Sequence, residues 1–152
     1  MNNTLRNLFY LFLPLVVGSV VGILTSSSID YNTLNQPPLS PPGFLFPIAW
    51  SILYLLVGIA YYLFQNTIYK NKTKETILYY LQLLVNALWS IFFFVLKWRL
   101  VSIFWIFLLG ILVLLLIILW NKRYKPSAYL FIPYFLWLIY ALYLNIGVYL
   151  LN

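Results

Sequence analysis

The side chains best suited to chemistry in this 152-residue chain are aromatic. Histidine and cysteine are absent, and the only carboxylate side chains are Asp30 and Glu75, which fall in different connecting segments. This composition disfavours a histidine-based triad, a cysteine nucleophile, a paired-carboxylate site and the usual zinc or haem ligands. We therefore expect no metal site and no resident cofactor. Any chemistry would be redox or photochemical, with a bound ligand and oxygen supplying the reactivity and tryptophan side chains as electron donors.

Three groups of residues at helical spacing combine aromatic, small and isolated polar side chains. Residues three or four apart share one face of a helix. The groups are Trp50 and Tyr54; Asn86, Trp89 and Phe93; and Trp137, Ala141, Leu144 and Asn145. Together they favour a pocket for a flat hydrophobic ligand. In the alternative interpretation the rings only pack the core, while Asn86 and Asn145 form hydrogen bonds between helices.

The elements that must position these residues are long apolar stretches. A helix needs about 20 apolar residues to cross the hydrocarbon core, and it satisfies its own backbone hydrogen bonds there. Mean hydropathy is +0.95, and only 7% of residues are charged. The stretches, none of which contains Asp, Glu, Lys or Arg, are 8–24, 44–64, 77–96, 100–120 and 128–151. We predict an all-α integral membrane bundle of five transmembrane helices, forming a single domain over 1–152.

The ends of the stretches carry further signals. The first stretch is about membrane length and is not followed by an A-x-A-like site, so we expect a retained span rather than a cleaved signal peptide. Trp98, Trp120 and Tyr124 lie where interfacial aromatic residues are usual.

The basic residues divide unequally between the two sides of such a bundle. The net charge of +7 is distributed over loops and does not indicate nucleic-acid binding. Only Lys97 and Arg99 fall on one side. The other side carries Arg6, Lys70, Lys72, Lys74, Lys122, Arg123 and Lys125. The positive-inside rule then predicts a multi-pass protein with a cytoplasmic N-terminus and a C-terminus outside.

The connection at 25–43 is the longest, and it holds four of the eight prolines. Proline fixes its own φ and pushes the preceding residue towards extended geometry. We expect a stiff, non-helical segment that covers the bundle as a lid. The alternative is a plain connector.

Three blocks of sequence carry a resemblance to a known family. They are Y-N-T-L-N-Q-P-P-L-S-P-P-G-F-L-F-P-I-A-W-S-I-L-Y at 31–54, N-A-L-W-S-I-F-F at 86–93, and I-P-Y-F-L-W-L-I-Y-A-L-Y-L-N at 132–145, followed by Leu151-Asn152. The combination of P-P-G-x-x-x-P-x-x-W with P-Y-x-x-W…L-N is specific. In this order, and over nearly the whole chain, the blocks resemble the translocator protein family, also called the tryptophan-rich sensory protein or peripheral-type benzodiazepine receptor family.

The resemblance implies a five-helix bundle, often a homodimer, that binds porphyrins, sterols and synthetic aromatic ligands under its first loop. It also implies location in a bacterial plasma membrane. Some bacterial members promote light- and oxygen-dependent breakdown of protoporphyrin IX through two tryptophans that match Trp50 and Trp137. We accordingly expect the ligand to contact Tyr31, Pro41, Pro42, Trp50, Tyr54, Asn86, Trp89, Phe93, Trp137, Ala141 and Leu144.

The chain departs from the family pattern in several places. Asp30, Leu39 and Phe44 stand where the family often has tryptophan. The last stretch lacks the basic residue of the cholesterol-associated pattern, which is itself a weak motif. Cholesterol is therefore a doubtful partner, and a porphyrin such as protoporphyrin IX is favoured over it.

Three functions remain open from the sequence. The first is a membrane receptor or binding protein for porphyrins and other planar hydrophobic ligands, with a role in stress response. The second is photo-oxidative porphyrin degradation with Trp50 and Trp137 as electron donors. The third is a structural membrane protein with a lipid-filled cavity.

Two further expectations concern charge and assembly. Lys97 and Arg99 are the basic residues on the lid side, so we expect them to pair with porphyrin propionates, which cannot stay unpaired in hydrocarbon. The alternative is that both merely anchor helices at the interface. Gly18-x-x-x-Gly22 would permit close helix packing, either within the bundle or between subunits.

Overall fold

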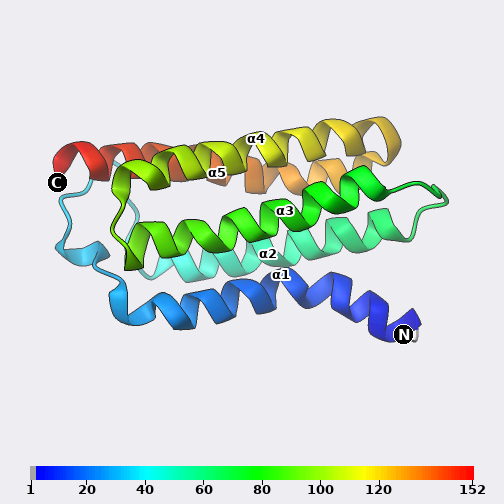
Figure 1. Cartoon of the computed structure of the whole chain (residues 1–152), viewed down its shortest axis with the longest axis horizontal. Helices are drawn as coiled ribbons and strands as arrows, with labels where there is room; N and C mark the ends of the chain where they lie inside the picture. Colours follow the sequence, from blue (N-terminus) through cyan, green and yellow to red (C-terminus); the bar gives the residue numbers. More distant parts are fainter. Residues whose placement is uncertain (1–2) are drawn as a thin grey trace.

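The computed structural model describes residues 3–152, and these residues form five long helices that run side by side (Figure 1). A five-residue π-helix, η3 (Ile91–Val95), continues α3, and η3 is counted with α3 as one span. Each span is long and apolar enough to cross a membrane. The helices are α1 (Asn3–Thr25), α2 (Leu45–Gln65), α3 (Thr73–Ser90), α4 (Arg99–Arg123) and α5 (Lys125–Leu151). The predicted all-α membrane bundle is confirmed, and the chain is a multi-pass integral membrane protein.

Apart from α2, which is displaced by one residue, the observed helices begin or end a few residues outside the predicted stretches. The extensions are polar or charged, as with Lys74 and Glu75 at the start of α3 and Lys122 and Arg123 at the end of α4. Hydropathy finds only the part of a helix that lies in hydrocarbon, whereas backbone hydrogen bonding continues into the interface.

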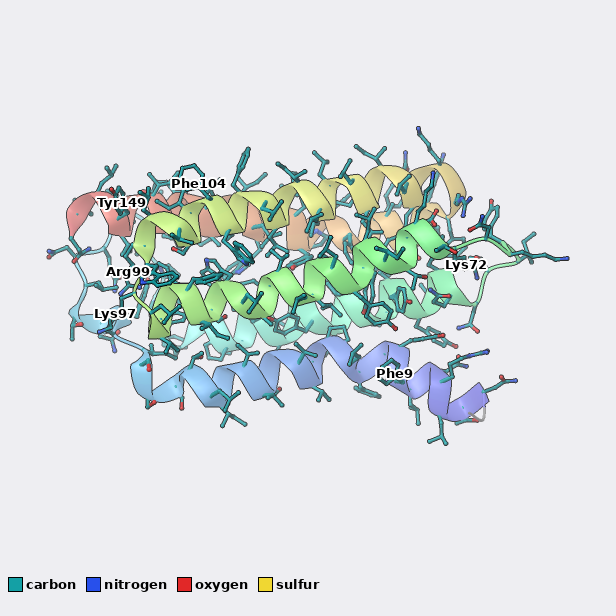
Figure 2. All side chains as sticks on the ribbon, viewed as in Figure 1. Phe9, Lys72, Lys97, Arg99, Phe104 and Tyr149 are labelled. Carbon is teal, nitrogen blue, oxygen red and sulfur yellow. The ribbon has the colours of Figure 1, made fainter. Side chains whose placement is uncertain are left out.

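The two ends of the bundle differ in charge and in connections. Figure 1 shows the N-terminal end of α1, the α2–α3 connection and the α4–α5 connection at one end of the bundle. The C-terminus, residues 26–44 and the α3–α4 link lie at the other. Figure 2 labels Lys72 at the first end and Lys97 and Arg99 at the second. We call them the basic end and the lid end.

Helix α1 packs mainly on α2, through glycine. A Cβ added at Gly58 would lie 1.9 Å from the carbonyl oxygen of Leu11, so the two backbones touch there. A Cβ at Gly18 would lie 2.0 Å from the ring of Tyr54, whereas one at Gly22 would meet nothing within 4 Å. In the expected small-residue motif, Gly18 therefore serves packing within the bundle and Gly22 leaves space.

Aromatic rings fill the core at the basic end. The Tyr61 and Tyr79 rings stack with centroids 3.6 Å apart, and Trp120 lies between Phe64 at 5.3 Å and Phe131 at 4.7 Å. Trp120 is fully buried, so its prediction as an interfacial residue was wrong. Its position in the last turn of α4 suggested the interface, but its side chain points to α2 and α5 instead.

The outer faces of the bundle are apolar. Figure 2 shows side chains such as those of Phe9, Phe104 and Tyr149 directed away from the helices, and all three are exposed. A membrane span surrounded by lipid is expected to look like this, because hydrocarbon replaces water as the solvent for these side chains.

Two buried asparagines join helices, as the sequence suggested. Asn86 accepts a hydrogen bond from the Tyr54 hydroxyl at 2.6 Å and donates one to Tyr134 at 2.8 Å, which joins α3 to α2 and α5. Asn145 accepts from the Trp89 indole at 3.2 Å and from Ser102 at 3.1 Å, which joins α5 to α3 and α4.

Candidate ligand cavity

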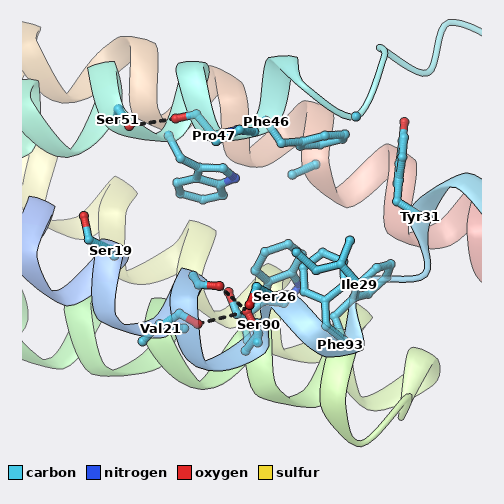
Figure 3. Close-up of a pocket in the computed structure, with 18 of the residues that line it drawn as sticks. Ser19, Val21, Ser26, Ile29, Tyr31, Phe46, Pro47, Ser51, Ser90 and Phe93 are labelled. Atoms are coloured by element: carbon cyan, nitrogen blue, oxygen red, sulfur yellow. Dashed lines mark hydrogen bonds between the residues drawn. The ribbon is translucent and has the colours of Figure 1, made fainter.

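A cavity of about 950 Å³ opens between α1, α2, the end of α3 and α5 at the lid end (Figure 3). Figure 3 shows Phe46 and Pro47 of α2 on one side, with Ser26 and Phe93 facing them. The expected site residues that line the cavity are Tyr31, Trp50, Tyr54, Trp89, Phe93, Trp137, Ala141 and Leu144. The structure thus brings together eight residues that lie up to 113 positions apart in the sequence.

Trp50 is at the centre of the aromatic wall. Its ring centroid lies 5.4 Å from Tyr54, 6.1 Å from Trp89 and 6.4 Å from Trp137. The Trp50 and Tyr54 rings stack, and the Trp137 ring stands at 84° to that of Trp50. These rings present both flat faces and edges to the cavity, an arrangement that suits a planar aromatic ligand.

Trp137 carries a polar atom without a partner. Its indole N–H is buried and has no hydrogen-bond acceptor among the described residues, whereas the Trp89 N–H is used by Asn145. A buried donor without an acceptor is costly, and ligands often satisfy such groups. Trp137 lines the cavity, but its N–H is buried in the wall and does not face the open space.

The helix that carries Trp89 widens where it meets the cavity. Residues 91–95 form a π-helix, and Phe93 and Phe94 from this segment line the cavity. The Leu96 N–H bonds to the Ile91 carbonyl at 3.0 Å, five residues back. Single π-turns inside α-helices are frequent at functional sites. Nothing in the sequence beyond the aromatic run signalled this feature.

Several lining residues were not predicted. Phe46 lies four residues before Trp50, and its ring contacts Tyr31 at 4.9 Å and Trp137 at 6.1 Å. The same i, i+4 spacing that identified Tyr54 would have found it. Helix α1 supplies Gly18, Ser19 and Gly22. Small residues such as these leave space rather than bind, so only the glycine spacing hinted at them.

Three expected site residues do not line the cavity. Asn86 lies behind it and orients Tyr54 through their hydrogen bond. Pro41 accepts a hydrogen bond from the Tyr31 hydroxyl at 2.7 Å, so it positions that ring from the lid. Pro42 begins the turn into α2, since its carbonyl accepts from Leu45 at 3.0 Å.

The segment 26–44 lies across the lid end and is fixed to α5. Tyr140 and Tyr143 donate to the carbonyls of Leu39 and Pro38, each at 2.7 Å. Asn152 and Asn35 exchange two hydrogen bonds of 2.9 Å, which attach the C-terminus to the same segment. The segment is therefore held against α5 at this end of the bundle, and its role as a lid stays a prediction.

The prediction that this segment is non-helical was partly wrong. Two short 3₁₀ turns, η1 (Ser26–Ser28) and η2 (Tyr31–Thr33), precede the proline-rich part. Proline constrains only itself and the residue before it, and neither turn contains either.

Lys97 and Arg99 are already paired. Arg99 donates from one nitrogen to both oxygens of Asp30, at 3.0 and 2.9 Å, and the Lys97 ammonium lies 3.3 Å from Asp30. Burial alone would raise the pKa of Asp30, but the hydrogen bonds and charges of Arg99 and Lys97 together hold that pKa below its usual value. No sequence pattern indicated this contact, since Asp30 and Arg99 are 69 residues apart.

Comparison with known proteins identifies the family of this chain. The model of the TspO/MBR family matches residues 10–151. A tryptophan-rich protein TspO of Archaeoglobus fulgidus is 32% identical over 99% of both chains. Protein CrtK of Rhodobacter capsulatus is 31% identical, covering 93% of this chain and 89% of the relative. The Bos taurus translocator protein is 30% identical, covering 76% and 70%. With a match over nearly its whole length, the chain belongs to the TspO/MBR family.

Proposed function

We propose that the chain is a membrane binding protein for porphyrins and related planar hydrophobic ligands. The observation that carries the proposal is the cavity of about 950 Å³ walled by Trp50, Trp89 and Trp137. Its volume is at the upper end of the range for small-molecule sites, which are mostly apolar with a few polar groups. The names of two relatives, translocator protein and tryptophan-rich sensory protein, are consistent with a ligand-linked role.

The physical basis is stacking in an environment without water. Stacking of a nucleobase on an aromatic side chain is worth about 1–3 kcal/mol, and a porphyrin ring offers a larger π-face. The lid, held by Tyr140, Tyr143 and Asn152, covers the same end.

A second candidate is porphyrin degradation driven by light and oxygen. The observation that favours it is that Trp50 and Trp137 meet in the cavity wall with ring centroids 6.4 Å apart. Both indoles would then adjoin the same bound pigment, as electron donors to its excited state. A lipid-filled cavity with only a structural role is the third candidate.

One experiment separates the three functions. Purified protein in detergent is titrated with protoporphyrin IX in the dark and then illuminated in air, with matched samples of Trp50→Phe and Trp137→Phe. Saturable binding without faster pigment loss supports the binding protein. Faster loss in wild type that disappears in both variants supports degradation. Absence of saturable binding would overturn the proposal and leave the structural role.

We also propose an orientation with the basic end in the cytoplasm and the lid end outside, in a bacterial plasma membrane. The support is the gathering of seven of the nine basic residues at one end. The chain has no cysteine, so single cysteines can be read without background. In intact cells, Leu39→Cys should react with an impermeant thiol reagent and Asn71→Cys should not. The reverse labelling would contradict this orientation.

A further inference from the structure

We propose that Arg99 and Lys97 form a carboxylate-binding subsite at the mouth of the cavity, and that Asp30 occupies it as an internal stand-in for the carboxylate of the ligand. A ligand that carries a peripheral carboxylate would bind by displacing Asp30. The inference rests on the proposed function and adds to it the charge of the ligand and the residue that competes with it.

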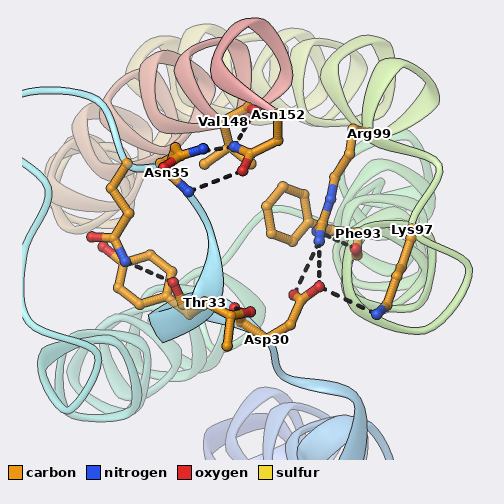
Figure 4. A network of polar contacts seen from close by, with 10 residues as sticks. Asp30, Thr33, Asn35, Phe93, Lys97, Arg99, Val148 and Asn152 are labelled. Atoms are coloured by element: carbon orange, nitrogen blue, oxygen red, sulfur yellow. Dashed lines mark hydrogen bonds and ion pairs between the residues drawn. The ribbon is translucent and has the colours of Figure 1, made fainter.

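The geometry of the cluster is that of a carboxylate site. Figure 4 shows Asp30 facing Arg99 and Lys97 across the gap between the lid and the start of α4. The Asp30 carboxylate accepts from Arg99 through both oxygens and pairs with Lys97 at 3.3 Å. Guanidinium groups recognise carboxylates strongly, and nothing in this arrangement requires the carboxylate to come from the protein itself.

Asp30 sits on the boundary of the cavity. Its neighbours on either side, Ile29 and Tyr31, line the cavity, whereas Asp30 lines an adjacent hollow of about 820 Å³ together with Lys97 and Arg99. The carbonyl of Asp30 is fixed by the Thr33 N–H at 2.9 Å and the Thr33 hydroxyl at 2.7 Å. With the backbone held, the side chain can leave Arg99 without unfolding the turn.

Arg99 is separated from the cavity by a single ring. Its guanidinium lies 4.2 Å from the ring centroid of Phe93 and donates to the Phe93 carbonyl at 2.5 Å. Phe93 also stacks on Trp89, with centroids 5.6 Å apart, and lines the cavity. A planar ligand resting on these rings would place its edge groups close to the guanidinium.

The two cations differ in how accessible they are. The Arg99 side chain is 13% exposed, and its contacts are to Asp30 and Phe93, whereas the Lys97 side chain is 59% exposed. Lys97 also adopts a left-handed φ of 56°, which is uncommon for a residue with a side chain. Residues held in such conformations gather at functional sites. Lys97 is placed to meet an incoming anion first, and Arg99 to hold it.

The cluster keeps an excess positive charge. Two cations face one carboxylate, and among residues 3–152 these two are the only basic side chains at the lid end. A carboxylate entering the apolar cavity needs a partner, because an unpaired charge there is strongly disfavoured. This cluster is the partner that the lid end offers.

The test compares protoporphyrin IX with its dimethyl ester, which has the same ring without the negative charges. Both are titrated by quenching of tryptophan fluorescence, and the ratio of the two dissociation constants is taken within each variant. The variants are Asp30→Asn, Arg99→Gln, the double variant, and Glu75→Gln. Glu75 is the matched control: it is the only other acidic residue, and it pairs with Arg123 at 3.0 Å at the basic end.

Removing the stand-in should favour the free acid. We expect Asp30→Asn to raise the affinity for the free acid, relative to that for the ester, by roughly tenfold. Arg99→Gln should lower this relative affinity by a similar factor. The gain from Asp30→Asn should vanish in the Arg99→Gln background, and Glu75→Gln should keep the wild-type ratio.

Three results would overturn the subsite. In the first, the ratio is unchanged in Asp30→Asn, including the case in which both ligands weaken equally because the lid loosens. In the second, Asp30→Asn and Glu75→Gln shift the ratio equally, which would mean that only net charge matters. In the third, wild type binds neither ligand, and the proposed function falls with the subsite. Binding of both ligands with an unchanged ratio overturns the subsite alone.

Discussion

The two ends of this bundle use the same kinds of residues to opposite effect. At the basic end, Tyr61, Tyr79 and Trp120 are fully or almost fully buried against neighbouring rings. At the lid end, Trp50 and Trp137 are only partly buried and enclose a cavity of about 950 Å³. Aromatic content alone therefore does not mark a binding site.

What differs is the spacing between helices, which small residues and proline set. Gly58 brings the backbone of α1 against α2 near the basic end, since its added Cβ would lie 1.9 Å from the Leu11 carbonyl oxygen. At the lid end Gly22 meets nothing, and Ala141 contributes little volume. Pro14 lies inside α1 between Leu11 and Gly22, and Figure 1 shows α1 changing direction near its middle.

Removing one tryptophan from each end should separate stability from binding. Trp120→Ala should lower the free energy of unfolding by about 3–5 kcal/mol, because it empties a packed core. Trp137→Ala should instead weaken protoporphyrin IX binding by roughly ten- to hundredfold, because it removes a stacking surface. Thermal unfolding and fluorescence titration in the same detergent measure the two effects. Equal loss of stability in both variants would contradict the comparison.

The sequence predicted the spans and the aromatic faces because both depend on local periodicity. Trp50 with Tyr54, and Trp137 with Ala141 and Leu144, share helical faces whatever the tertiary structure, and all five line the cavity. The features that were missed depend on contacts distant in sequence or on side-chain direction.

Four examples show what local patterns could not supply. Asp30 meets Arg99 across 69 residues, and Trp120 turns inward although it lies at a helix end. Asn86 stands behind the cavity rather than in it, because Tyr54 and Tyr134 both reach its side chain. The π-turn at 91–95, which contains the lining residues Phe93 and Phe94, has no signature in the local pattern.

Adding one methyl group at each end should sharpen the packing difference. Gly58→Ala should destabilise the protein by about 1–3 kcal/mol, because its Cβ would overlap the Leu11 carbonyl. Gly22→Ala should be neutral or stabilise by up to about 1 kcal/mol, since it gains helix propensity without a clash. Gly110→Ala is the control, because its Cβ also meets nothing and it does not line the cavity. Similar melting temperatures for Gly58→Ala and Gly110→Ala would refute the close contact.

The smallest expected effect is the acid sensitivity of the lid end. Because the pKa of Asp30 is lowered in the fold, its ion pairs stabilise the protein above the unfolded value near 3.9, and that contribution is lost as pH falls through the folded pKa. We expect a loss of at most about 1 kcal/mol, since the pairs are partly exposed. Melting curves from about pH 7 to about pH 2, which passes below the unfolded pKa, should show a smaller acid loss in Asp30→Asn than in wild type. An identical acid loss in the two proteins would exclude this contribution.

The most direct test of the cavity places a larger side chain of α5 in it and compares the effect with that of the same substitution in the packed core near the basic end. Ala141 lines the cavity, whereas Ala128 is buried on the same helix near the basic end. Titration with protoporphyrin IX should show that Ala141→Leu loses at least about tenfold in affinity with an unfolding temperature close to wild type, and that Ala128→Leu unfolds earlier while its folded fraction still binds. Wild-type affinity in a folded Ala141→Leu protein would contradict the account, because the ligand would then bind elsewhere.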